Sequence, residues 1–214
     1  MLTGIKGAIF DLDGVIVDTA QFHFLAWKQL AHKLGFDFTE VDNERLKGVS
    51  RTRSLEILLE IGNVTVSEEE KLALATEKNE LYVAYIQELR HSDLLPGTKE
   101  LVEALKHNGV KIALGSASKN ALFILDRLGI REWFDVIIDG NSTSAAKPDP
   151  EVFLLGCQAL GVEARNCVVF EDSAAGVEAA KLANMKVIGI GHIDHLVHAD
   201  QVVKSLGELL SLRL

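Results

Sequence analysis

Cysteines and long hydrophobic runs are scarce in this sequence, and each scarcity excludes a class of protein. The two cysteines, Cys157 and Cys167, are too few for a disulfide framework or a structural zinc site, so we expect reduced, buried thiols. No run of about 18 apolar residues is available to cross a bilayer. The N-terminal segment lacks the basic start and apolar centre of a signal peptide, from which we expect a cytoplasmic protein.

Positive charge is also in deficit. Lys and Arg total 22 against 31 Asp and Glu, which gives a net charge of -9. Because no basic stripe interrupts this balance, we expect neither nucleic acid nor a membrane surface as a partner. The net negative charge of the protein would repel a phosphate-bearing substrate, so local cations or a metal ion would have to offset this repulsion.

Short apolar runs rich in β-branched residues alternate with amphipathic helical patterns along the 214 residues. This alternation predicts an α/β protein with a parallel sheet and helices on both faces. Functional sites in such sheets lie beyond the carboxyl ends of the strands. The expected strands are Ala8 to Phe10, Lys111 to Leu114, Val136 to Ile138, Cys167 to Phe170 and Val187 to Ile190.

The interval between the first two expected strands breaks this alternation. From about Asp18 to Leu94 the sequence shows helical patterns and no convincing strand; one long helix should open at the capping box of Ser67 and Glu70. We therefore expect a helical insert at 18–94 after the first strand, large enough to form a small domain of its own. The remaining residues, 1–17 and 95–214, should form the parallel-sheet core.

Two acids, Asp11 and Asp13, directly follow the first expected strand in the sequence DLDG. In extended chain their side chains would point the same way, so like charges would lie side by side. A single DxDG sequence is more often a solvated turn, and the position of Gly14 does not match a calcium-binding EF-hand loop. The interpretation of this pair therefore depends on the residues at the ends of the other strands.

A turn of small residues at 115–120 comes after the second strand and leads into a helix. Its hydroxyls, including that of Ser116, and its backbone N-H groups could bind an anion. Ser118 or Asn120 could equally serve as an ordinary helix N-cap. The sequence leaves these two interpretations about even.

Lys147 and a second pair of acids stand at later strand ends. Lys147 precedes Pro148, and the fourth strand ends in Glu171 and Asp172. Each feature alone is compatible with solvated side chains. In a parallel sheet, however, all of them would converge at one edge.

Four acids facing one lysine in a small cleft need more positive charge, and a divalent cation would supply it. Because the candidate ligands are all oxygens, the pattern favours Mg²⁺ over zinc. The expected metal site consists of Asp11, Asp13, Glu171 and Asp172. Within this set, we do not expect the side chain of Asp13 to coordinate the metal directly. Such a site suits phosphoryl transfer, with Asp11 as the nucleophile and Asp13 as the group that moves protons.

These four motifs, in this order, resemble those of the haloacid dehalogenase superfamily. The resemblance implies a Rossmann-like core, a helical cap inserted after the first strand and one Mg²⁺ per chain. It also implies an aspartyl phosphate on Asp11, with Ser116 and Lys147 in the catalytic site. The presence of an acid at Asp13 points to the phosphotransferases rather than the dehalogenases.

The stretches DTAQFHFLAW, LKGVSR, KNELY and SASKN resemble the sugar phosphomutases of this superfamily. That resemblance implies conversion of β-glucose 1-phosphate into glucose 6-phosphate through β-glucose 1,6-bisphosphate, which is both intermediate and activator. It assigns Arg51 to the phosphate that is not being transferred, and His23 with Lys78 to the restraint of Asp13. The other implied substrate-binding residues are Lys47, Gly48, Val49, Ser50, Ser118, Lys119 and Asn120.

Residue chemistry alone supports these assignments less strongly. A histidine on an amphipathic helix, such as His23, is more often structural, and Trp27 is equally suited to core packing or a sugar-pocket wall. We expect His192, His195 and His198 to lie in a solvated polar loop rather than to bind zinc.

Two alternatives remain beside the mutase. A sugar-phosphate phosphatase of the same superfamily would pass the phosphate to water, and a phospho-accepting signalling domain would not turn over sugar phosphates. Signalling receivers lack a helical insert after the first strand, which argues against the second alternative. The expected partner is a small sugar phosphate, and we expect a monomer.

Overall fold

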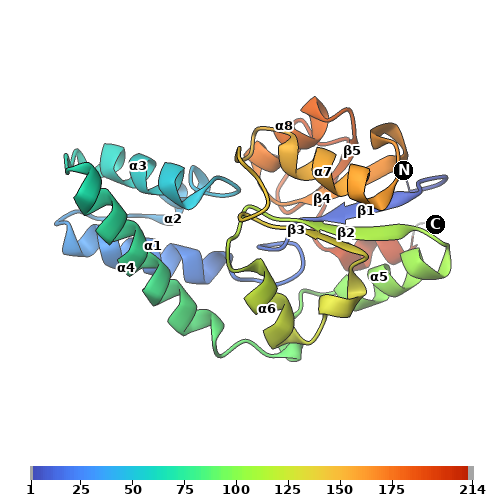
Figure 1. Ribbon diagram of the computed structural model, residues 1–214, viewed down its shortest axis with the longest axis horizontal. Helices are drawn as coiled ribbons and strands as arrows, with labels where there is room; N and C mark the ends of the chain where they lie inside the picture. Colours follow the sequence, from blue (N-terminus) through green and yellow to red (C-terminus); the bar gives the residue numbers. More distant parts are fainter. Residues whose placement is uncertain (1, 212–214) are drawn as a thin grey trace.

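The computed structural model describes residues 2–211 and contains a parallel sheet in the order β3-β2-β1-β4-β5-β6 (Figure 1). Successive strands add on one side of β1 and then on the other, so the order reverses between β1 and β4. Crevices that bind ligands form at such reversals. The strands are β1 (Gly7–Phe10), β2 (Lys111–Gly115), β3 (Val136–Ile138), β4 (Cys167–Glu171), β5 (Lys186–Ile190) and β6 (Gln201–Val203).

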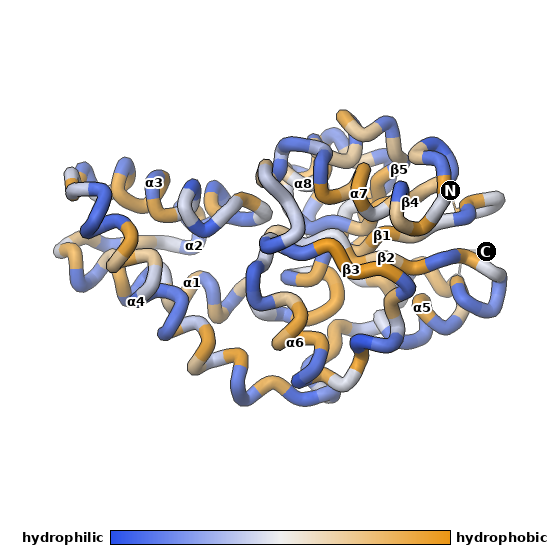
Figure 2. The backbone as a smooth tube through the Cα atoms, viewed as in Figure 1, coloured by the Kyte–Doolittle hydropathy of each residue, from blue (hydrophilic) through white to orange (hydrophobic). Residues whose placement is uncertain are grey.

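Helices cover both faces of the sheet. Helices α7 (Glu151–Leu160) and α8 (Ala174–Leu182) share one buried cluster with the sheet, whereas α5 (Thr98–His107) and α6 (Ala121–Leu128) share the cluster on the opposite face. Figure 2 shows the hydrophobic strands β2 and β3 running between these layers.

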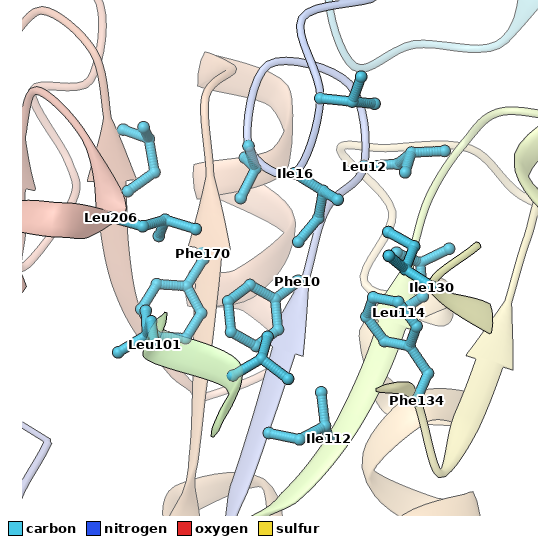
Figure 3. Close-up of a cluster of buried hydrophobic side chains, with 14 of the residues drawn as sticks. Phe10, Leu12, Ile16, Leu101, Ile112, Leu114, Ile130, Phe134, Phe170 and Leu206 are labelled. Carbon is cyan, nitrogen blue, oxygen red and sulfur yellow. The ribbon is translucent and has the colours of Figure 1, made fainter. Parts of the chain in front are cut away.

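Apolar packing around β1 holds the sheet in place. Phe10 and Phe170 stack with their ring centroids 4.4 Å apart, and both side chains are fully buried. Figure 3 shows this pair beside Leu101 of α5 and Leu206. Because β1 is central and buried on both faces, the residues directly after it are fixed by packing rather than by a flexible loop.

Four α-helices lie between β1 and α5 and form a helical body beside the sheet (Figure 1, left). Part of this body packs around its own hydrophobic cluster, which includes Trp27, Leu58 and Phe38, whereas Tyr82 and Ile86 of α4 belong to the cluster that α5 and α6 share with the sheet. The expected capping box of Ser67 and Glu70 is confirmed at the start of the fourth helix. These helices are α1 (Ala20–Lys33), α2 (Glu40–Glu44), α3 (Arg51–Gly62) and α4 (Glu68–Ile86).

The two segments that join this body to the core run side by side. Val17 forms an isolated antiparallel bridge with Leu94, and the Leu95 N-H donates to the Ile16 carbonyl at 2.9 Å. We call the helical body the cap; its division from the core at 18–94 remains a prediction.

Several local features differ from expectation or lay outside it. Strand β6 was not predicted, because three residues after a polar loop carry too little pattern to be recognised. Cys157 and Cys167 are buried and free, as expected. Among residues 2–211, no helix combines the length and apolarity needed to span a membrane. Short 3-10 helices occur at His91–Asp93, Arg131–Trp133, Ala164–Asn166 and Leu206–Ser211.

Candidate active site

The register of the sheet places three polar side chains at one edge. Phe10 pairs with Leu114 on one side and with Phe170 on the other. Asp11 follows β1, Ser116 follows β2 and Glu171 ends β4, so all three lie at the carboxyl edge of the sheet. Ser116 and Glu171 are completely buried, and Asp11 is only 5% exposed.

Lys147 joins two of these acids. Its Nζ lies 2.6 Å from Asp11 Oδ1 and 2.6 Å from Glu171 Oε1. Burial opposes the charged ammonium, but the two carboxylates outweigh it and raise the pKa of Lys147 above its ordinary value. Lys147 is therefore a buried cation held by carboxylates, rather than the solvated residue that a lysine before a helix usually is.

The pKa values of the acids show that Lys147 does not neutralise the cluster. Burial raises the pKa of Asp11 from 3.8 to about 7 despite Lys147, with Glu171 and Asp13 adding to the rise. Burial and the charges of Glu171 and Asp11 likewise raise the pKa of Asp172 well above its ordinary value. The cluster therefore carries too little positive charge to keep all its carboxyl groups ionised, and at least one more cation would stabilise the ionised forms.

The donor set fits a hard divalent cation. Among residues 2–211, one group of acidic, His or Cys side chains could hold a metal ion: Asp11, Glu171 and Asp172, whose ligand atoms all lie within 4.8 Å of one another. Oxygen donors alone favour Mg²⁺. The backbone N-H and the hydroxyl of Ser173 both donate to Glu171 Oε2 at 2.8 Å, which orients this carboxylate.

Two glycines allow this close packing of acids. Gly14 has φ +80°, and a Cβ there would lie 2.2 Å from Asp172 Oδ2. A Cβ at Gly176, in the first turn of α8, would lie 1.9 Å from the Glu171 carboxyl. Gly14 is thus required by backbone conformation and by the space that Asp172 occupies.

The side chain of Asp13 is not part of this group. Its Oδ1 accepts hydrogen bonds from the Thr19 hydroxyl and, at 3.3 Å, from the Tyr82 hydroxyl. His23 Nε2 lies 3.8 Å away. Burial raises the pKa of Asp13 although the hydrogen bonds from Thr19 and Tyr82 oppose the rise. The side chain of Asp13 is thus directed to Thr19 and Tyr82, and whether it contacts a metal stays a prediction.

His23 and Lys78 form a contact beside Asp13. Lys78 Nζ lies 2.6 Å from His23 Nδ1 and 4.5 Å from the centre of the Trp27 ring. Burial and the charge of Arg51 lower the pKa of Lys78 to about 7, and burial lowers the pKa of His23 well below its ordinary value. Burial and the neighbouring charges of Lys78 and Arg51 thus disfavour the charged form of His23.

A cavity of about 480 Å³ lies between the cap and the carboxyl edge of the sheet. Asp11 and Asp13 line it, as does the half-buried Arg51; burial lowers the pKa of Arg51. Ser116 and Glu171, which are completely buried, are not among the residues that line it. The other expected residues that line the cavity are His23, Trp27, Lys47, Gly48, Val49, Ser50, Lys78, Ser118, Lys119, Asn120, Lys147 and Asp172.

Some placements resolve questions that the sequence left open. Trp27 is 2% exposed and belongs to the cap cluster, and it also lines the cavity; a role as a wall of a sugar pocket stays a prediction. His192, His195 and His198 are exposed in the turns between β5 and β6.

Sequence reasoning assigned no role to Tyr82, Ser173 or Asn79. Tyr82 lies four residues after Lys78, a spacing that places both on one helix face and could have indicated it. Ser173 directly follows the second acid pair, and its side chain caps α8. Only the folded contacts distinguish Asn79 from its neighbours.

Comparisons with known proteins agree with this geometry. A family model for haloacid dehalogenase-like hydrolases matches residues 5–184. A β-phosphoglucomutase of Bacillus subtilis (strain 168) is 42% identical over 207 residues, which span 96% of this chain and 92% of that protein. A phosphorylated carbohydrates phosphatase of Thermotoga maritima is 35% identical, over 88% of this chain and 86% of that protein.

A solved structure extends the likeness to the whole fold. The crystal structure of β-phosphoglucomutase (pgmB) from Clostridium difficile superposes with a TM-score of 0.91 at 47% identity. The match covers 96% of this chain and 93% of that one. This chain belongs to the family of haloacid dehalogenase-like hydrolases.

Proposed function

We propose that this protein interconverts β-glucose 1-phosphate and glucose 6-phosphate through an aspartyl phosphate on Asp11 and through β-glucose 1,6-bisphosphate. The observation that carries the proposal is a cavity with phosphate-binding groups at two places. Asp11 and Lys147 lie at the sheet edge, while Arg51 of the cap and Asn120 of the core also line the cavity. A mutase needs both places, because one phosphate is held while the other is transferred.

The similarity to β-phosphoglucomutases supports the same conclusion. The relatives from Bacillus subtilis and Clostridium difficile are 42% and 47% identical to this chain and cover nearly all of it.

The residues of this chain divide the chemistry between them. An oxygen of Asp11 attacks the phosphorus at C1 of the bisphosphate, the bond from that phosphorus to the sugar oxygen breaks, and glucose 6-phosphate leaves after Asp13 donates a proton to the leaving oxygen. In the other half-reaction, Asp13 takes a proton from the 6-hydroxyl of β-glucose 1-phosphate as this oxygen attacks the aspartyl phosphate, which frees Asp11 and forms the bisphosphate again. Lys147 offsets negative charge at Asp11, and Ser116 offers a hydroxyl at the same edge.

Asp11, Glu171 and Asp172 would hold a Mg²⁺ ion, which when bound would supply charge neutralisation for the phosphate oxygens. Asp13 must leave Thr19 and Tyr82 before it can reach the sugar. We propose that His23 and Lys78 restrain it until the cap closes on substrate. This restraint would limit hydrolysis of the aspartyl phosphate between half-reactions.

A phosphatase remains the second candidate, because the relative from Thermotoga maritima is named for phosphatase activity on phosphorylated carbohydrates. The two candidates differ in which molecule accepts the phosphate from Asp11. The assay supplies β-glucose 1-phosphate, Mg²⁺ and a trace of β-glucose 1,6-bisphosphate, and measures glucose 6-phosphate and inorganic phosphate separately. We expect glucose 6-phosphate, formed faster when bisphosphate is added; release of inorganic phosphate without glucose 6-phosphate would overturn the mutase assignment.

A further inference from the structure

Helix α4 presents one face to the cavity. Leu72, Ala75, Thr76 and Asn79 all line it, and their spacing of three, one and three residues places them on the same side of the helix. Asn79 lies next to Lys78, which contacts His23. This face therefore extends toward the residues that hold Asp13.

Asn79 makes a hydrogen bond across the cavity. The side-chain N-H of Asn120 donates to Asn79 Oδ1, with 3.0 Å between the two atoms. Asn79 belongs to the cap and Asn120 to the core, and 41 residues separate them in sequence. The contact is distinct from the paired connecting segments at Val17 and Leu94. It can therefore form only when the cap faces the core in this orientation.

The Asn120 side chain contacts Asn79 and does not cap its own helix. It occupies the N-cap position of α6, where an asparagine side chain usually accepts a hydrogen bond from a backbone N-H of the first turn. Asn120 makes no such bond. The first backbone N-H groups of α6 are thus left for another acceptor, and an anion suits them.

We propose that Asn79 is a positioning residue: by holding the Asn120 amide, it prepares the start of α6 to bind the non-transferred phosphate when the cap closes. This inference rests on the proposed function, which places that phosphate between Arg51 and Asn120. Asn79 acts through Asn120 and touches neither Asp11 nor the metal ligands. Its loss should therefore weaken capture of the bisphosphate without slowing chemistry at Asp11.

A double-mutant cycle tests this coupling. Asn79→Ala should raise the KM for β-glucose 1,6-bisphosphate about 3- to 10-fold, the range for one hydrogen bond, with little change in kcat. Asn120→Ala should raise this KM at least as much, and the double variant should have the same KM as Asn120→Ala alone. Phosphorylation of Asp11 by acetyl phosphate, which has no second phosphate, should match wild type. Glu80→Ala, at an exposed position next on α4, is the matched control.

Two results would overturn the proposal. One is that the two substitutions have additive effects on the KM for the bisphosphate; the other is that Asn79→Ala slows phosphorylation of Asp11 equally with acetyl phosphate and with the bisphosphate. Thermal unfolding of each variant separates these outcomes from general destabilisation. Binding of the bisphosphate to the same variants in an Asp11→Asn background, measured by calorimetry, does not depend on turnover. If the wild type proves to be a phosphatase, the proposed function fails, whereas this binding cycle still decides the role of Asn79.

Discussion

The cluster of acids at the sheet edge predicts that replacing Asp11, the proposed nucleophile, stabilises the metal-free protein. Asp11 is buried, and its pKa is raised from 3.8 to about 7. Asparagine resembles the protonated carboxyl in shape and charge, so Asp11→Asn removes the cost of ionising this group while Lys147 keeps its contact with Glu171. The substitution should abolish turnover and, without metal, strengthen the fold.

The pH dependence is set by the direction of the shift. Because the pKa of Asp11 is higher in the folded protein than in the unfolded chain, the folded state binds more protons between about pH 4 and pH 7. The unfolding free energy of the metal-free wild type should therefore fall as the pH rises through this window. The advantage of Asp11→Asn should grow from about 1 kcal/mol near pH 4.5 to about 4 kcal/mol near pH 8.

Urea unfolding, followed by tryptophan fluorescence in the presence of a chelator, measures these free energies across the pH range. The exposed Asp18 provides the control, and Asp18→Asn should leave the wild-type pH profile unchanged. Added Mg²⁺ should stabilise the wild type at high pH and the Asp11→Asn variant less, because that variant lacks one of the proposed ligands. Parallel pH profiles for wild type and Asp11→Asn without metal would refute the reasoning.

Three further substitutions address the proposed reaction. Asp13→Ala should slow transfer to and from sugar oxygens by about 10²-fold or more, since a positioned acid-base group is lost; unchanged rates in rapid-quench experiments would remove its role. Arg51→Ala should raise the KM for the bisphosphate and shift flux toward hydrolysis, whereas Arg53→Ala, at an exposed position, should not; an unchanged mutase rate would contradict the assignment of the cap. Gly48→Ala should lower kcat/KM, because Gly48 has φ +73° and its new Cβ would lie 2.3 Å from the Ser173 hydroxyl; a normal value would show that the cap need not approach so closely.

Local patterns in the sequence were sufficient for most of the fold. The capping box at Ser67 and the apolar periodicity of α4 predicted that helix, because its hydrogen bonds and caps involve residues three or four apart. The alternation of strands and helices predicted a parallel sheet, and the shared edge of parallel strands then predicted that Asp11, Lys147 and Glu171 meet. Strand β6 was missed because three residues carry almost no periodic signal.

The sequence by itself therefore determined the α/β architecture and the acids gathered at one sheet edge, since both depend on local hydrogen bonding and strand direction. Only the tertiary structure decided how the cap meets the core. The contacts of Tyr82 with Asp13 and of Asn79 with Asn120 span 69 and 41 residues. They depend on how the cap helices lie against the core, and no spacing within a single helix or loop specifies that arrangement.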